Sequence, residues 1–196
     1  ASRPGVEGVR ALAGRKDWAA VVALAQETLK RDPPDEEAAE TQYLLGTGYQ
    51  SLDLHDEAIA ACQTLVDRWP ASAFADDGRF RLAKSYYLQA KYEPATEHFQ
   101  RLQADHPRHE YQASANLYCG ESFFHLRKYS RALERLQACA ATRDKKYVFH
   151  ACFWMGMAYR ALDEPANAEK AFRRAIAEAP DPNHAVLARA RAELEK

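Results

Sequence analysis

Three histidines lie close enough in the sequence to be considered as metal ligands. His98 and His106 fall toward the end of a predicted helix, and His109 follows in the turn after it. A neutral imidazole binds zinc, and His106 and His109 flank Pro107, so the pair could hold one ion. No further ligand has a suitable position, although Glu110 is adjacent. We therefore favour solvated turn residues and expect no metal or other cofactor.

The four cysteines, Cys62, Cys119, Cys139 and Cys152, match neither a CxxC pattern nor a metal-finger spacing. The last three are expected at core positions of neighbouring helices, as buried thiols or as a disulfide pair. A catalytic thiol needs a nearby base and an electropositive, partly open site. The histidine nearest in sequence, His150, is expected to point away from Cys152, so the pattern does not favour a nucleophilic cysteine.

The sequence also lacks GxGxxG, GxxxxGK[ST], HExxH and GxSxG motifs. Gly46-Thr47-Gly48 resembles part of a phosphate loop, but it is predicted to lie inside a helix, where backbone donors are already used. The 196 residues carry a formal net charge of −1, which lacks the electrostatic signature of a nucleic-acid binder. No apolar run approaches the roughly 18–20 residues of a membrane span. We predict a non-enzymatic protein without nucleic-acid partners or a membrane span.

The elements that position these residues follow a period. Small residues recur at intervals of 37, 37, 37 and 36, and prolines follow nearly the same interval. An aromatic or leucine residue precedes each small residue by nine positions. The small residues are Val21, Ala58, Ala95, Ala132 and Ala168; the aromatic column is Leu12, Tyr49, Tyr86, Phe123 and Tyr159; the prolines are Pro33, Pro70, Pro107 and Pro180.

Each repeat reads as two helices. In the second repeat, apolar residues at helical spacing run from Tyr43 to Leu52, and a second stripe runs from Ala58 to Val66. Pro70 ends the second helix because it has no backbone N–H and its ring clashes with the preceding turn. We expect small residues to let the two helices approach closely, with Gly46 facing Ala58, Ala83 facing Ala95, Gly120 facing Ala132 and Gly156 facing Ala168.

This pattern resembles the tetratricopeptide repeat family. The matching motifs are Leu45, Gly46 and Tyr49, then Ala95, Phe99 and Pro107, and Ala168, Phe172 and Pro180. The resemblance implies an all-α fold: a right-handed superhelix, or α-solenoid, of helical hairpins with a C-terminal capping helix, forming a single array over residues 1–196. We expect about eleven helices, with turns near Lys16, Asp53, Lys91, Lys128 and Asp163. The expected repeats are 2–35, 39–72, 76–109, 113–146 and 149–182, with the capping helix at 183–196.

A second resemblance concerns Arg68-Trp69-Pro70, followed by Ser72 and Ala75. This string is similar to repeats of bacterial cell-envelope proteins, such as outer-membrane assembly lipoproteins and Tol–Pal-associated periplasmic proteins. It slightly favours the bacterial cell envelope over the cytoplasm as the location. The sequence begins at Ala1, which is expected either after removal of a targeting peptide or in a fragment of a longer chain.

The family resemblance implies that the first helices of the repeats line a concave groove. Such an aromatic groove with sparse charges suits an apolar peptide or helix of a partner. Tyr87, Phe124 and Phe153 are expected as exposed rings on one wall, although rings in such positions also fill helix–helix contacts. The carried-over groove residues are Tyr43, Thr47, Gln50, Phe80, Lys84, Tyr87, Leu117, Glu121, Phe124, Phe153, Met157 and Arg160, with Val6 and Arg10 in the first repeat.

Two functions remain open. One is a scaffold or adaptor that binds another protein in its groove. The lysine and asparagine clamp of chaperone adaptors is not supported, because Val6 and Arg10 occupy those positions. The other is a self-assembling structural subunit that stacks end to end. The tail is expected to be sealed by a polar outer face, whereas Val6, Val9 and Leu12 are expected to lack a partner.

Overall fold

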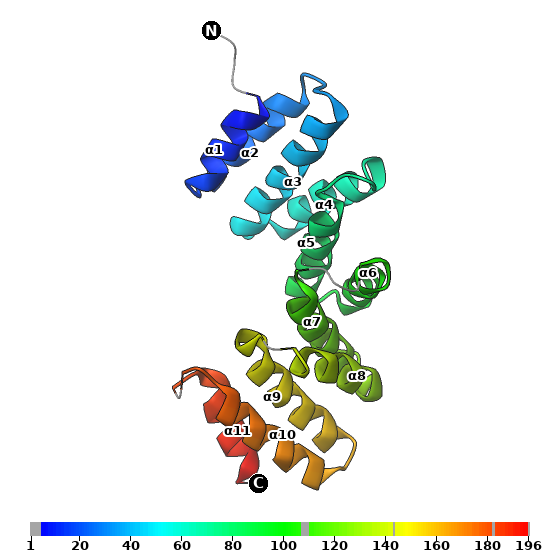
Figure 1. The fold of residues 1–196 in the computed structure, drawn as a ribbon, viewed down its shortest axis with the longest axis vertical. Helices are drawn as coiled ribbons and strands as arrows, with labels where there is room; N and C mark the ends of the chain where they lie inside the picture. The colour runs from blue at the N-terminus through cyan, green and yellow to red at the C-terminus, as the bar shows by residue number, and fades with distance from the viewer. Residues whose placement is uncertain (1–4, 107–109, 143, 182, 196) are drawn as a thin grey trace. The chain divides into compact units, whose positions relative to one another are not determined.

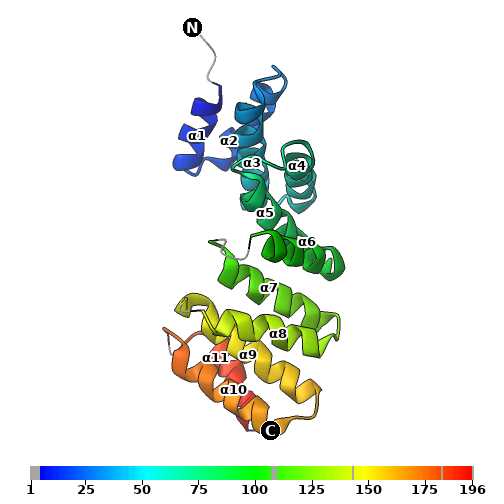
Figure 2. The same ribbon diagram turned by 45° about the vertical axis from the view of Figure 1, so that its right-hand side comes forward.

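The computed structural model describes residues 5–106, 110–142, 144–181 and 183–195, and in these ranges every regular element is a helix. Consecutive helices form hairpins (Figures 1 and 2), which confirms the predicted all-α class. The helices are α1 (Val6–Gly14), α2 (Trp18–Leu29), α3 (Asp35–Ser51), α4 (His55–Arg68), α5 (Ala75–Leu88), α6 (Tyr92–Asp105), α7 (Gln112–His125), α8 (Tyr129–Ala140), α9 (Lys145–Ala161), α10 (Pro165–Glu178) and α11 (Ala185–Leu194).

The chain divides into two compact parts, residues 1–98 and 99–196, and each is described by itself. In the N-terminal part each of the helices α1 to α4 packs on the next, and α3 also packs on α1 and α5. In the C-terminal part each of the helices α7 to α10 packs on the next, and α9 also packs on α7 and α11. The first helices of successive hairpins are therefore neighbours within each part.

Each hairpin turns through one residue in the left-handed backbone region. These residues are Lys16, Asp53, Ala90, Arg127 and Asp163, with φ between 55° and 60°. The amide of the next residue donates to the carbonyl of the aromatic column, as Leu54 does to Tyr49 and Lys91 does to Tyr86, both at 2.9 Å. This six-residue helix-ending bond satisfies a carbonyl that the helix leaves free. The predicted turns are confirmed within one residue.

Glycines on three first helices allow large residues of the second helices to pack against the backbone. A Cβ built on Gly46 would lie 2.6 Å from Cys62 Sγ, one on Gly120 would lie 2.6 Å from Leu136 Cγ, and one on Gly156 would lie 2.5 Å from the Phe172 ring. The expectation that Gly46 faces Ala58 and Gly156 faces Ala168 is wrong by one helical turn, whereas Gly120 approaches the Ala132 carbonyl, at 3.3 Å from a Cβ built there, as well as Leu136. The closest side chain belongs to the residue four positions later.

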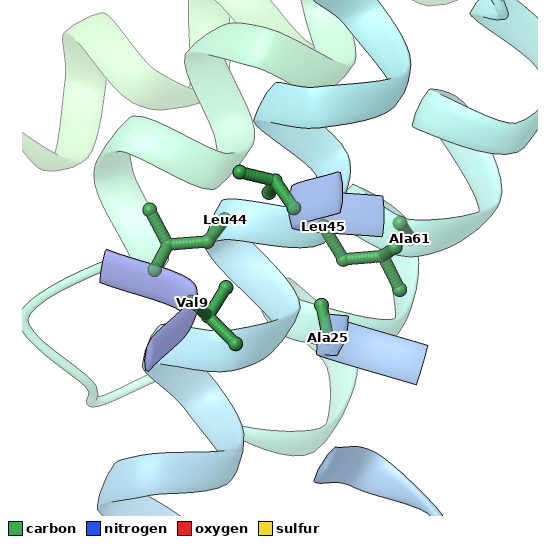
Figure 3. Close-up of a cluster of buried hydrophobic side chains, with 6 residues drawn as sticks. Val9, Ala25, Leu44, Leu45 and Ala61 are labelled. Carbon is green, nitrogen blue, oxygen red and sulfur yellow. The ribbon is translucent and has the colours of Figure 1, made fainter. Parts of the chain in front are cut away.

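The N-terminal hairpin has a filled core. Val9 of α1 lies with Val21 and Ala25 of α2 and with Leu44 and Leu45 of α3 (Figure 3). Leu12 packs against this cluster, and Val6 is buried as well. The expectation that Val6, Val9 and Leu12 lack a partner is therefore wrong, because Val9 and Leu12 pack in a cluster with residues of α2 and α3, and Val6 is buried.

Helix α11 caps the C-terminal part. It packs on α10 and also contacts α9. Leu187 and Ala190 form its buried face, and both are shielded almost completely from water. Its N-terminus is capped by His184, whose Nδ1 accepts the Val186 amide at 3.3 Å. The predicted capping helix is confirmed.

Candidate functional site

In the N-terminal part, Arg81 of α5 ties α3 to α5 on the face predicted to bind a partner. Its guanidinium donates to the Tyr43 hydroxyl at 3.2 Å and to Gln50 Oε1 at 3.1 Å, and it lies 5.2 Å from the Tyr43 ring centroid. Gln50 Nε2 donates in return to the Arg81 carbonyl at 3.2 Å and to Ser85 Oγ at 2.9 Å. The amide group of Gln50 is thus committed to contacts between the two first helices.

The other predicted residues of this part divide into buried and accessible groups. Phe80 and Thr47 are buried, and the Thr47 hydroxyl donates to the Tyr43 carbonyl at 2.9 Å. Lys84 and Tyr87 are only half-buried. The Tyr87 ring makes an edge contact with Tyr92 at 6.1 Å between centroids. Tyr43, Lys84 and Tyr87 therefore keep some surface that a partner could contact.

In the C-terminal part, Phe124 of α7 belongs to an aromatic cluster. Its ring centroid lies 5.0 Å from Trp154 of α9, 5.5 Å from Tyr129 and 5.8 Å from His125. Phe124 and Trp154 are half-buried. Trp154 is not among the residues predicted to line the groove, although it directly follows the predicted Phe153. Phe124 corresponds to Gln50 in the period, and both residues contact the first helix of the following repeat.

Phe153 does not stand as an exposed ring, so that expectation is wrong. Its side chain is 1% exposed. Its ring lies 5.9 Å from Phe172 of α10, and the Arg189 guanidinium of α11 lies 4.8 Å from its centroid. Leu117 and Glu121 of α7 are also buried. A partner could not reach these three side chains without rearrangement of the helices around them.

Arg160, the last predicted groove residue, pairs with α11. Its guanidinium donates to the Glu193 carboxylate and, at 3.3 Å, to the Glu193 carbonyl. Arg189 also extends toward Trp154, with 6.0 Å from its guanidinium to the ring centroid. Met157 remains half-buried. In the C-terminal part the accessible residues of the predicted set are therefore Phe124, Met157 and Arg160, the last with a side chain 32% exposed, and Trp154 lies beside Phe124.

A pair of histidines joins α9 to the start of α11. The His150 ring lies 5.1 Å from His184 and 4.1 Å from Phe149. Burial, and secondarily the charge of His184, lower the pKa of His150 to about 4. Both effects disfavour the imidazolium form in this position.

This pKa predicts a loss of stability in mild acid. The unfolded chain binds a proton at His150 near the ordinary histidine pKa of about 6.5, whereas the folded chain binds it only near pH 4. The contribution is complete above pH 6.5 and is lost as the pH falls toward 4. The difference between the two pKa values corresponds to about 3 kcal/mol, which solvent screening of the half-buried His150 reduces to about 1–2 kcal/mol. Urea titrations at a series of pH values should show this slope. The variant His150→Phe should flatten it, and an unchanged slope in that variant would contradict the assignment.

The cysteines are poorly suited to nucleophilic chemistry. All four are buried and free. Burial raises the pKa of the Cys62, Cys119 and Cys139 thiols to about 12 and that of Cys152 to about 11. Because the thiolate is the nucleophile, these groups stay unreactive at neutral pH. Cys152 lies in the middle of α9, and its charge contributes to the raised pKa of Cys139.

Neither a metal site nor a membrane helix is found in the part of the chain that the structure describes. No group of three or more His, Cys, Asp or Glu side chains there could hold an ion. Pro107 and His109, named above with His106, lie outside the described residues. Among the helices that are described, none combines the length and apolar character needed to cross a bilayer.

The family model of the tetratricopeptide repeat-like domain matches residues 35–195, a range that begins with α3 and leaves out α1 and α2. Among curated proteins, none matches the sequence.

Several solved structures share the fold. YrrB, described as a TPR protein with an unusual peptide-binding site, superposes with a TM-score of 0.79 at 16% identity, over 95% of this chain and 90% of its own. MamA superposes with a TM-score of 0.76 at 19% identity, over 87% of this chain and 93% of its own. TTC0263 from Thermus thermophilus does so with 0.62 at 21% identity, over 97% of each chain. At these identities the likeness shows the fold alone.

Proposed function

Because the chain belongs to the tetratricopeptide repeat-like family, we propose that it is a non-catalytic scaffold whose first helices bind a peptide or helix of a partner protein. The fold supports protein partners in general. The peptide-binding description of YrrB, a structure with the same fold, supports the more specific proposal. The string Arg68-Trp69-Pro70 further leads us to propose the bacterial cell envelope as its location.

The observation that carries the proposal is the incomplete burial of rings on the first helices. Tyr87 in the N-terminal part and Phe124 and Trp154 in the C-terminal part are half-buried, while their neighbours Phe80, Leu117 and Phe153 are buried in helix contacts. Rings that leave part of their surface accessible but are held in place by neighbouring rings make good interface anchors, because little side-chain freedom is lost on binding. Lys84 adds one charge in the N-terminal part.

A displayed library of random peptides tests this surface. Peptides selected on the protein should bind the variant Tyr87→Ala/Phe124→Ala about 30-fold or more weakly, because each lost anchor typically costs about 2 kcal/mol. Fluorescence anisotropy with labelled peptides gives the affinities. The matched control is Leu52→Ala/Leu162→Ala, which removes two side chains exposed at hairpin turns, 39% and 37%. Equal binding by both variants, with folding intact, would refute the first-helix surface.

A distribution of charge favours a second candidate, self-assembly. Residues 1–98 carry 11 Lys and Arg against 16 Asp and Glu, a net charge of −5, whereas residues 99–196 carry 16 against 12, a net charge of +4. Opposite charges on the two parts of one chain favour head-to-tail association of copies. Mass measured across a dilution series at low and high salt separates the candidates. A mass that stays at the monomer value of 22.1 kDa at every concentration would exclude self-assembly.

A further inference from the structure

A cavity of about 490 Å³ lies at one edge of the N-terminal part, and none of the residues carried over from the family lines it. It is formed where α3 begins, α4 ends and the connection to α5 crosses between them. This volume is within the roughly 300–1,000 Å³ of typical ligand pockets. Its lining is Asp35, Glu36, Arg68, Trp69, Pro70, Ala71, Ser72, Ala73 and Phe74.

The walls of the cavity are held in place by contacts within the protein. Trp69 Nε1 donates to Asp35 Oδ1 at 2.8 Å, and the Ser72 amide donates to the Trp69 carbonyl at 3.0 Å. The Phe74 ring stacks on Tyr43 with 5.4 Å between centroids. A preformed cavity of this kind loses little conformational freedom when a ligand enters.

The charges around the cavity favour a cation. Asp35 and Glu36 line it, and Glu37 completes an acidic first turn of α3. These carboxylates already compensate the positive end of the α3 dipole, so the helix start does not call for an anionic ligand. Against the two carboxylates of the lining, Asp35 and Glu36, there is one positive side chain, Arg68, whose guanidinium lies 4.6 Å from the Trp69 ring centroid.

The exposed carboxylates of Asp35 and Glu36 supply hydrogen-bond acceptors on the lining of the cavity. Guanidinium and ammonium groups carry only donors. The apolar walls of Trp69, Pro70 and Phe74 suit the methylene chain that leads to such a group.

We propose that this cavity binds an arginine or lysine side chain, flanked by an apolar residue, in an extended segment of a partner protein. The carboxylates of Asp35 and Glu36 recognise the cation, and the rings hold the aliphatic stem. Tyr87 and Phe124, the residues that test the first-helix surface proposed above, do not line this cavity.

Fluorine NMR on protein labelled with 5-fluorotryptophan tests the site, because the chain has three tryptophans and only Trp69 lines the cavity. The variant Trp69→Phe assigns its resonance. The probes are acetylated, amidated tripeptides with leucine on both sides of arginine, glutamine or glutamate. The Trp69 resonance should shift with the arginine peptide, and at least 5-fold more glutamine peptide should be needed for the same shift. Equal responses to arginine and glutamine, or none at Trp69, would overturn the proposal.

A charge-removing variant tests whether the carboxylates, rather than the shape of the cavity, give the preference for arginine. Asp35→Asn/Glu36→Gln retains an oxygen to accept the Trp69 N–H and should abolish the preference for arginine over glutamine. The control Asp53→Asn/Glu57→Gln removes two exposed carboxylates at the turn before α4 and at its first turn, and should keep the preference. The variant Tyr87→Ala/Phe124→Ala should also keep it, so the two proposed surfaces fail independently. Self-association that disappears in Asp35→Asn/Glu36→Gln would make a second copy the occupant and overturn the assignment to a partner protein.

Discussion

Replacing Gly156 with alanine is expected to destabilise the protein by up to about 2 kcal/mol. The added Cβ would lie between 2.5 and 2.7 Å from three atoms of the Phe172 ring. That ring is 1% exposed and packed against Phe153, so it has no free direction in which to move. Overpacking of this kind costs about 1–3 kcal/mol or more and outweighs the helix propensity gained from alanine, about 1 kcal/mol.

Gly14→Ala is the matched control. Gly14 ends α1, and a Cβ built there meets nothing within 4 Å. The same substitution should therefore leave stability unchanged or raise it by up to about 1 kcal/mol. Urea unfolding followed by circular dichroism measures both. A loss at Gly156 no larger than at Gly14 would show that the α9–α10 contact is not as tight as the structure has it.

Replacing Leu187 with alanine is expected to release α11. Leu187 is 1% exposed and, with Ala190, forms the buried face of this short helix. Truncation of a buried leucine costs about 2–5 kcal/mol. Because α11 is a terminal helix of ten residues, the loss should appear first as local opening rather than as global unfolding. Hydrogen exchange should accelerate by about 30-fold or more across 185–194, which corresponds to about 2 kcal/mol.

The fluorescence of Trp154 gives a second measurement, because Arg189 lies near its ring and would leave with the helix. Leu194→Ala is the control, since that leucine is at the end of α11 and only half-buried. It should accelerate exchange much less. Equal exchange in the two variants would mean that Leu187 does not anchor the helix.

The fold was predictable from the sequence because its determinants are local. The period of small residues fixes the spacing of hairpins, and in the second repeat the turn at Asp53 directly follows the apolar stripe of the first helix. The structure places left-handed residues at Lys16, Asp53 and Asp163 as predicted, and one position early at Ala90 and Arg127. The spacing of the hairpins and the positions of the turns do not depend on how distant parts of the chain pack.

The facing of helices was less predictable because it depends on rotation about the helix axis. The aligned repeats show which positions hold small residues, but not which residue of the second helix each one faces. Gly46 meets Cys62 rather than Ala58, because the helices cross at an angle. Periodicity alone cannot distinguish two candidate partners that lie one helical turn apart on the same helix.

The candidate site was predictable only in part, because its accessibility depends on neighbours that the repeat pattern does not contain. Phe153 and Arg160 occupy the same columns as Tyr43 and Gln50, yet α11 contacts both. The bridging role of Arg81 and the cluster around Trp154 arise from adjacent first helices. The cavity beside Trp69 requires the start of one helix to meet the end of another, which a repeat-by-repeat alignment does not show.

The pairing of a glycine with a different large residue in each hairpin bears on how such a gene can change by duplication and recombination. Gly46 faces the small thiol of Cys62, Gly120 faces Leu136 and Gly156 faces the ring of Phe172. An exchange with its breakpoints between hairpins transfers both members of a pair and leaves the fit intact. A breakpoint inside a hairpin combines a first helix shaped for one volume with a second helix of another. The unit that recombination can copy safely is therefore the whole hairpin, with its turn, and not the single helix.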